Sequence, residues 1–223
     1  MSLIDRNPRA FLKSWIAEII GTFFLLTVIL AAPTGITFAA AGAAVLVMVV
    51  ALGKTSGAHL NPAVTAGLVA ARQFPVKDGG LYVAAQFIGA LLAIGGANVF
   101  DRPLTDVVRR NDAFLAEMLG AFLLVFVVSQ VTFNEVPEIG SALGIGVALA
   151  LGVLIAGPNS GGVLNPAIGL ALLLTGNVSG VLGGLLPYLL APLIGGVVAG
   201  RLAEYFAPVR VPRNDARRGA ESL

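Results

Sequence analysis

The tripeptide Asn-Pro-Ala occurs twice in this chain, at Asn61-Pro62-Ala63 and at Asn165-Pro166-Ala167. Each copy follows a long apolar run and begins a shorter apolar segment, over residues 62–71 and 166–175. Ten helical residues reach only about 15 Å, which is half the thickness of the hydrocarbon core of a bilayer. Asn followed by Pro is a favourable helix start, because the Asn side chain caps the helix and Pro suits its first position. The pattern predicts two half-length helices and indicates a pore between them.

The composition is that of a membrane protein. Hydrophobic residues make up 57% of the chain and charged residues only 12%, whereas an average soluble domain has about 25% charged residues. A helix needs about 20 mostly apolar residues to cross a bilayer. The predicted spans are residues 15–32, 36–53, 81–100, 113–133, 139–157 and 181–206. The first is long enough to span and precedes no small-residue cleavage site, so we interpret it as a helix rather than a cleaved signal.

The chain offers little material for catalysis or for metal binding. It has no cysteine, a single histidine and few carboxylates, so thiolate sites are excluded and no nucleophile, base and orienting group can be assembled. No patch of basic and aromatic residues indicates nucleic-acid binding. We therefore expect no enzyme activity, no cofactor and no metal ion.

The basic residues predict the orientation of the spans. If both termini lie on one side, that side collects every Lys and Arg except Arg102, Arg109 and Arg110, which lie in the link 101–112. The positive-inside rule then places both termini in the cytoplasm, together with the basic tail 207–223. The half-helix after Asn61 would enter from the cytoplasmic side and that after Asn165 from the external side.

The two halves of the chain are an internal repeat. The segment Ala17-Glu18-Ile19-Ile20-Gly21 matches Ala116-Glu117-Met118-Leu119-Gly120. We expect a single membrane domain over 1–223, with one repeat over about 13–100 and the other over about 112–206. Three spans in each half is an odd number, so the second half must be inverted relative to the first. Inverted repeats place their shared site near the middle of the bilayer.

The inversion makes the two half-helices meet at their N-termini. Each N-terminus carries roughly half a positive charge from the helix dipole, so the meeting point repels cations. We expect the side-chain oxygens of Asn61 and Asn165 to accept backbone N–H groups, with the amide hydrogens facing the lumen. Those hydrogens would orient a passing water molecule and interrupt a wire of hydrogen bonds that carries protons.

These features resemble the aquaporin family, also called the major intrinsic proteins, over residues 15–206. The resemblance rests on the paired motifs, on Ser56-Gly57-Ala58-His59-Leu60 before the first, and on the later pair Gln86 and Pro192. It implies an all-α bundle of six transmembrane helices with two re-entrant half-helices, assembled as a homotetramer in lipid. It also implies that Glu18 and Glu117 anchor the re-entrant loops, with a proton relay as the alternative. His59 is expected either to fix its loop or to supply a donor near the lumen.

The chain departs from the family at the external filter. The family usually has Arg after the second motif, and here that position is Ile168. The other filter positions fall on Gly162, Val153 and Ala41, which makes a wide apolar ring without charge. Gly169 stands where glycerol channels often have Asp. The ring predicts passage of glycerol, urea or metalloid hydroxides such as arsenous acid, together with water.

Other functions remain open at this stage. A water-selective channel is one alternative. An ion-coupled secondary transporter would have to use the carboxylates of Glu18 and Glu117, and a non-conducting scaffold would have to bind partners through short loops. The compact loops favour a prokaryotic plasma (inner) membrane.

Overall fold

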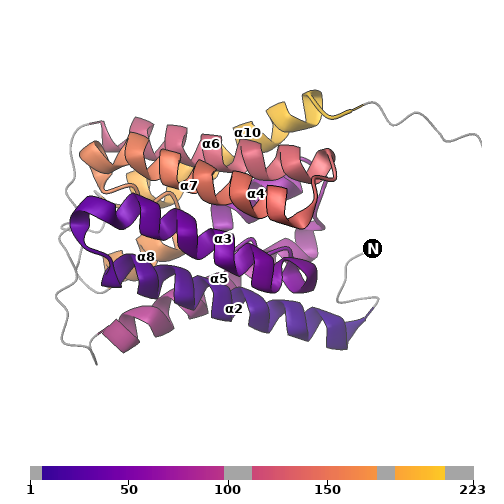
Figure 1. Cartoon of the computed structure of the whole chain (residues 1–223), viewed down its shortest axis with the longest axis horizontal. Coiled ribbons are helices and arrows are strands. Elements are labelled where there is room, and N and C mark those ends of the chain that lie inside the picture. Colours follow the sequence, from indigo (N-terminus) through magenta and orange to yellow (C-terminus); the bar gives the residue numbers. More distant parts are fainter. Residues whose placement is uncertain (1–6, 98–111, 175–183, 209–223) are drawn as a thin grey trace, which may run out of the picture.

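The structure, a computed structural model, describes residues 7–97, 112–174 and 184–208, in which six long helices run along one axis (Figure 1). The long helices are α2 (Pro8–Ala31), α3 (Thr37–Ser56), α5 (Val76–Ala97), α6 (Ala113–Phe133), α7 (Glu138–Ser160) and α10 (Ala191–Tyr205), the last continuing from the π-turn η3 (Leu186–Leu190). The short elements are α4 (Pro62–Ala70), α8 (Pro166–Leu174) and the 3-10 turn η1 (Thr34–Ile36). All six long helices, with η3 counted into α10, are long and apolar enough to cross a membrane. The predicted six spans and two half-length helices are confirmed.

The first helix begins earlier than predicted, at Pro8 rather than at residue 15. Asn7 caps it, because its side-chain oxygen accepts a hydrogen bond of 3.0 Å from the backbone N–H of Ala10. Asn7 and Pro8 thus repeat the Asn-Pro start of the two half-helices. The prediction followed only the apolar residues and missed a helical turn that carries Arg9 and Lys13.

The predicted bounds of the other spans differ for a similar reason. Helix α5 begins at Val76, five residues before the prediction, because its first turn carries polar residues that an apolar count leaves out. Helices α3 and α7 both extend by three residues at their C-terminal ends, to Ser56 and Ser160. The predicted ends at 98–100, 175 and 181–183 lie outside the described residues.

The last span contains a π-turn instead of a regular α-helix at its start. Pro192 has no N–H group, so the carbonyl of Tyr188, four residues earlier, cannot accept the usual α-helical hydrogen bond. The helix widens at this point, and the N–H of Ala191 bonds to the carbonyl of Leu186, five residues back. Gly169 of α8 packs on this turn, since a Cβ atom there would lie 2.7 Å from the Tyr188 carbonyl oxygen.

Helices α3 and α7, one from each half of the chain, touch through a reciprocal pair of glycines. A Cβ atom on Gly42 would lie 2.5 Å from the carbonyl oxygen of Gly146, and one on Gly146 would lie 2.7 Å from that of Gly42. Small residues of this kind let membrane helices approach closely, where packing rather than the hydrophobic effect holds them together. The equivalence of the two contacts matches the inverted repeat that the sequence indicates.

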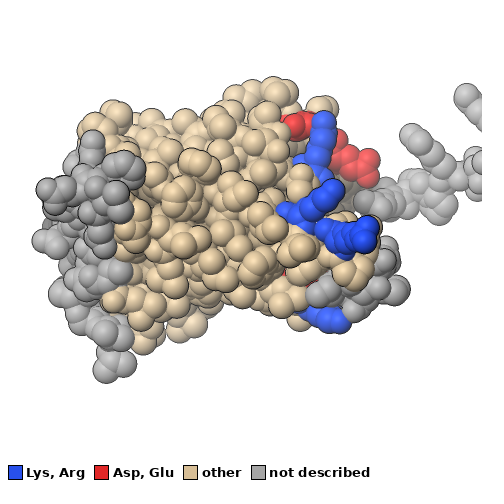
Figure 2. Space-filling view, turned by 90° about the horizontal axis from the view of Figure 1, so that it is seen from below, with Lys and Arg blue, Asp and Glu red and all other residues tan. Residues whose placement is uncertain are grey.

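Figure 2 shows Lys and Arg side chains gathered at one end of the bundle, which we call the basic end. The described Lys and Arg residues stand near the helix ends that lead to it: Arg9 and Lys13 early in α2, Lys54 late in α3, Arg72 after α4, Lys77 early in α5 and Arg201 late in α10. The start of α2 and the end of α10 also lie there (Figure 1).

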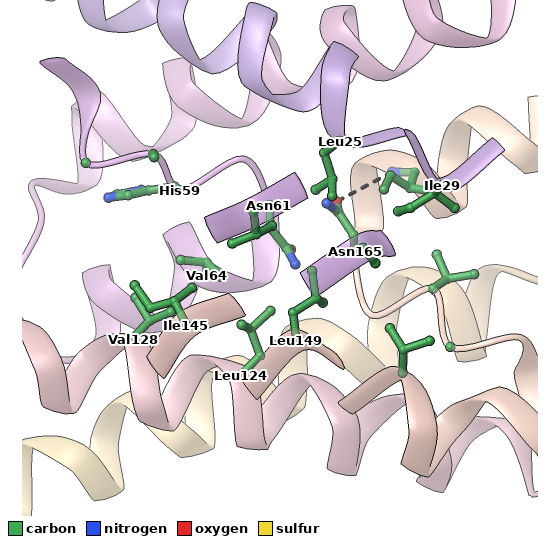
Figure 3. A pocket seen from close by; sticks show the side chains of 18 residues that line it. Leu25, Ile29, His59, Asn61, Val64, Leu124, Val128, Ile145, Leu149 and Asn165 are labelled. Carbon is green, nitrogen blue, oxygen red and sulfur yellow. Dashed lines mark hydrogen bonds between the residues drawn. The ribbon is translucent and has the colours of Figure 1, made fainter. Parts of the chain in front are cut away.

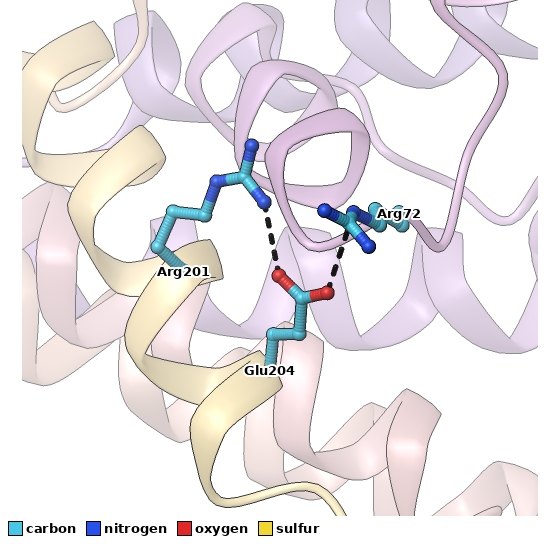
Figure 4. Close-up of polar contacts among 3 residues, drawn as sticks. All are labelled: Arg72, Arg201 and Glu204. Carbon is cyan, nitrogen blue, oxygen red and sulfur yellow. Dashed lines mark hydrogen bonds and ion pairs between the residues drawn. The ribbon is translucent and has the colours of Figure 1, made fainter.

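Ion pairs connect the elements at the basic end. Glu204 of α10 pairs with Arg72, after α4, at 3.5 Å and with Arg201 at 3.0 Å (Figure 4). Lys54 of α3 pairs with Glu138 of α7 at 2.7 Å. Exposed pairs of this kind contribute at most about 1 kcal/mol each, so the stability of the bundle has to come from the packed helices.

We predict that Gly42→Ala destabilises the bundle by about 1–3 kcal/mol, the usual cost of overpacking a tight contact. The added methyl group meets backbone atoms of α7, which cannot turn aside. The matched control is Gly95→Ala on α5, where a Cβ atom would meet nothing within 4 Å. Thermal unfolding in detergent would check this, and equal melting temperatures of the two variants would contradict it.

Candidate functional site: a pore between the half-helices

Two loops of equivalent conformation lead from the long helices α3 and α7 into the half-helices. Each begins with a glycine in the left-handed region, Gly57 with φ of 88° and Gly161 with φ of 85°, which ends the preceding helix. Each also contains a leucine before the Asn with positive φ, 53° at Leu60 and 51° at Leu164. These turns reverse the chain inside the bundle and leave several backbone N–H groups without helical partners.

The buried carboxylate of Glu18 accepts hydrogen bonds from the first loop. One of its oxygens accepts from the Ser56 hydroxyl at 2.7 Å and from the His59 N–H at 3.0 Å. The other accepts from the Leu60 N–H at 2.7 Å and from the Gln86 side-chain amide at 2.8 Å. The side chain is fully buried on α2, where an ionisable group needs partners of this kind.

Glu117 on α6 makes the equivalent contacts with the second loop. One oxygen accepts from the Ser160 hydroxyl at 2.5 Å and from the Val163 N–H at 2.8 Å, and the other accepts from the Leu164 N–H at 2.5 Å. Among the described residues Glu117 has three such donors, whereas Glu18 has four. The difference is the amide of Gln86, because the equivalent position in the second half is Pro192, whose side chain cannot donate.

The two Asn side chains cap their own half-helices and bond to the opposite loop. The side-chain oxygen of Asn61 accepts from the Ala63 N–H at 2.8 Å, and that of Asn165 accepts from the Ala167 N–H at 3.0 Å. The amide nitrogen of Asn61 donates to the Leu164 carbonyl, and that of Asn165 donates to the Leu60 carbonyl, both at 2.9 Å.

These bonds correct one expectation from the sequence. We expected both amide hydrogens of Asn61 and of Asn165 to face the lumen. One hydrogen of each amide instead bonds to the other repeat, so only one N–H of each side chain is left for a passing molecule. The prolines and alanines of the two motifs are buried at the starts of the half-helices.

Both Asn side chains line an elongated cavity inside the bundle, with His59 toward one end and Ile29 toward the other (Figure 3). The cavity volume is about 40 Å³. On the same measure, one water molecule needs roughly 10–15 Å³. Equivalent residues of the two repeats line it, such as Leu25 with Leu124 and Val45 with Leu149. The arrangement is that of a narrow, mostly apolar path.

The four residues assigned to the filter line this same cavity. They are Ala41, Val153, Gly162 and Ile168. Gly162, with φ of 70°, packs directly on Val153, since a Cβ atom at 162 would lie 2.9 Å from the Val153 carbonyl oxygen. The structure thus brings these four apolar residues, from three elements and a loop, to one cavity.

His59 also lines the cavity and is held by neighbours on several sides. Its Nδ1 lies 3.1 Å from the Thr65 hydroxyl, and its ring packs against Phe74 and Tyr82 with centroids 4.6 and 5.2 Å away. Burial lowers the pKa of the His59 imidazole to about 3, which keeps the ring neutral. Sequence reasoning gave no role to Thr65 and used Gln86 only as part of the resemblance. The hydrogen bond between Gln86 and Thr65 forms only in the folded protein, and the spacing of the two residues in the sequence does not indicate it.

The described residues contain no group of three or more His, Cys, Asp or Glu side chains that could hold a metal ion.

Comparison with known proteins assigns the family. The sequence model of the family described as "Major intrinsic protein" matches residues 6–200. The chain belongs to the major intrinsic protein family. It is 37% identical to Aquaporin NIP1-1 of Zea mays, over 82% of this chain and 71% of the maize protein. It is 36% identical to a probable NIP-type aquaporin of Nicotiana alata, over 95% and 84% of the two chains.

A solved structure has the same fold. The aquaglyceroporin from Plasmodium falciparum matches 87% of this chain and 96% of its own chain, with a TM-score of 0.74 and 24% sequence identity. Family membership makes this protein a multi-pass membrane channel of the aquaporin type and not an enzyme.

We predict that Glu117→Gln retains more folded and conducting protein than Glu117→Leu. Gln keeps an oxygen that can accept from the loop, whereas Leu leaves three buried donors unpaired at about 1–3 kcal/mol each. Water flux per folded protein in reconstituted vesicles would check this. Equal activity and equal melting temperatures of the two variants would contradict an anchoring role.

Proposed function

We propose that this channel passively conducts small neutral solutes such as glycerol, urea or arsenous acid, together with water. The observation that carries the proposal is the apolar and uncharged set Ala41, Val153, Gly162 and Ile168 along one cavity. With Ile168 in place of the family's usual Arg, this set has no fixed positive charge and no long side chain. Gly162 and Ala41 add little volume, so the ring is expected to admit molecules larger than water.

The paired Asn motifs are proposed to exclude protons and cations. Two half-helix N-termini facing each other supply positive potential at the centre of the path. One free N–H on each of Asn61 and Asn165 would donate to the oxygen of a passing molecule and so break a proton-conducting chain. Because the filter has no Arg, exclusion of cations rests more on these two helix ends.

The relatives support a channel of this class. The Zea mays and Nicotiana alata proteins are an aquaporin and a probable aquaporin, and the solved structure with the same fold is that of an aquaglyceroporin.

Orientation and assembly are also proposals. The basic end supports a cytoplasmic location of both termini in the plasma membrane. A homotetramer in lipid is the assembly that the family suggests, and exposed apolar side chains such as Val47, Leu92 and Leu151 offer surface for lipid or for further copies. A mass of about four times 22.7 kDa in mild detergent is the expected result.

A water-selective channel is the second candidate. The volume of about 40 Å³ open to water favours it, because this volume holds only a short file of waters.

Stopped-flow light scattering on reconstituted vesicles separates these functions. Fast entry of glycerol, urea and arsenous acid is the expected result, and fast water flux with those solutes excluded would establish the water-selective alternative. Saturable, proton-dependent uptake would indicate a coupled transporter. Absence of any flux would favour a scaffold.

We predict that Ile168→Arg lowers the flux of glycerol and arsenous acid at least about tenfold while water flux survives, since a barrier increase of about 1.4 kcal/mol is enough for that change. The long cation narrows the apolar ring. Ile168→Leu, which conserves volume and charge, serves as the control. Unchanged solute flux in Ile168→Arg would show that residue 168 does not line the constriction.

A further inference from the structure

The cavity has polar side chains at only three of its described lining positions, His59, Asn61 and Asn165. The two Asn residues are equivalent by the repeat, but His59 is not, because Val163 takes its place in the second half. His59 lies in the loop on the side of the basic end. The residue is 8% exposed, and its ring lines the cavity.

The neighbours of Thr65 determine which ring nitrogen carries the proton. A hydroxyl has one hydrogen to donate and two lone pairs to accept with. The Gln86 side-chain amide, 3.0 Å away, can only donate to it through nitrogen, and the Asn61 carbonyl, 3.2 Å away, can only accept. The hydroxyl therefore accepts from Gln86 and donates to Asn61. Its remaining lone pair accepts from Nδ1 of His59 at 3.1 Å, and this arrangement uses the full capacity of the hydroxyl.

A neutral imidazole with its hydrogen on Nδ1 has a bare lone pair on Nε2. Among the described residues, Nε2 of His59 has no hydrogen-bond partner. This nitrogen is also not completely buried. Contacts with Phe74 and Tyr82 prevent the ring from turning. The Nε2 edge lies beside Gly57, itself a lining residue, because a Cβ atom there would be 3.2 Å from Nε2. The bare nitrogen is thus accessible from the cavity.

We propose that His59 is held as the Nδ1–H tautomer and presents Nε2 as a hydrogen-bond acceptor, so that the channel favours solutes with O–H or N–H groups over neutral solutes that only accept. This inference rests on the proposed function and adds a specificity-determining residue to it. The sequence-based alternative of a lumen donor at His59 is replaced by an acceptor.

The acceptor complements the other polar groups of the cavity. The free amide hydrogens of Asn61 and Asn165 serve the oxygen of a solute, whereas Nε2 serves its hydrogens. A molecule with hydroxyl or amide groups finds partners for both after losing its water. A molecule that only accepts finds none at His59, where it would face the lone pair.

The tautomer can be read directly, because His59 is the only histidine in the 223 residues. Protein labelled with ¹⁵N-histidine and reconstituted in lipid at neutral pH gives two ring-nitrogen signals, and the unprotonated nitrogen resonates far downfield of the protonated one. We expect proton-coupled Nδ1 and bare Nε2. A proton on Nε2 would overturn the proposal. Thr65→Val removes the acceptor of the Nδ1 proton and is expected to raise the Nε2–H population.

A flux experiment compares urea, which can donate hydrogen bonds, with dimethyl sulfoxide, which can only accept them. The two molecules have the same number of heavy atoms. His59→Val, copied from the second repeat, is expected to lower the urea-to-dimethyl-sulfoxide flux ratio about fivefold, the rate equivalent of one hydrogen bond. Val147→Ala is the control, because Val147 is exposed on the outside of α7 and does not line the cavity, and it should leave the ratio unchanged. A ratio that His59→Val does not move would overturn the inference. Wild-type vesicles that pass only water would overturn the proposed solute conduction instead, and the NMR result would still decide the role of His59.

Discussion

The structure depends on one constraint, which is that backbone outside a helix cannot stay unpaired within a bilayer. Two loops, one between α3 and α4 and the other between α7 and α8, have backbone N–H groups that no helix pairs. Each is tolerated because a buried carboxylate, Glu18 or Glu117, accepts the N–H groups that the loop leaves over. The carboxylates are in turn stabilised by these donors, so that neither the charge nor the loop is acceptable in the membrane without the other.

The same constraint explains how the halves fix each other. The carbonyls of Leu60 and Leu164, which lie in left-handed turns, accept from the Asn of the opposite motif. The two half-helices are therefore positioned by a reciprocal pair of bonds at their meeting point, beside the cavity that both Asn side chains line. In the proposed function, the selection of solutes would come from the width of this path and from the few groups along it that can form hydrogen bonds.

Much of the fold could be predicted from the sequence, because hydrophobic length and the Asn-Pro helix start are local signals. The six spans and both half-helices follow from them. Helix ends were less predictable, since Asn7 extends α2 through a cap that apolar counting ignores, and Pro192 turns the start of the last span into a π-turn. The cross-bonds of Asn61 and Asn165, and the network of Thr65, Gln86 and His59, depend on residues that meet only after folding. Their partners cannot be recognised from spacing.

The bond between Asn61 and the carbonyl of Leu164 joins residues 103 positions apart. During synthesis the first half therefore enters the membrane with this amide and the Leu60 carbonyl still lacking their final partners. A nine-residue half-helix is also too short to be held in the bilayer as a span. The hydrogen bonds of the first re-entrant segment are therefore complete only after the second has been translated and inserted. A chain that ended between the two motifs could form the contacts of Glu18 with the first loop, but not the bonds that join the two half-helices.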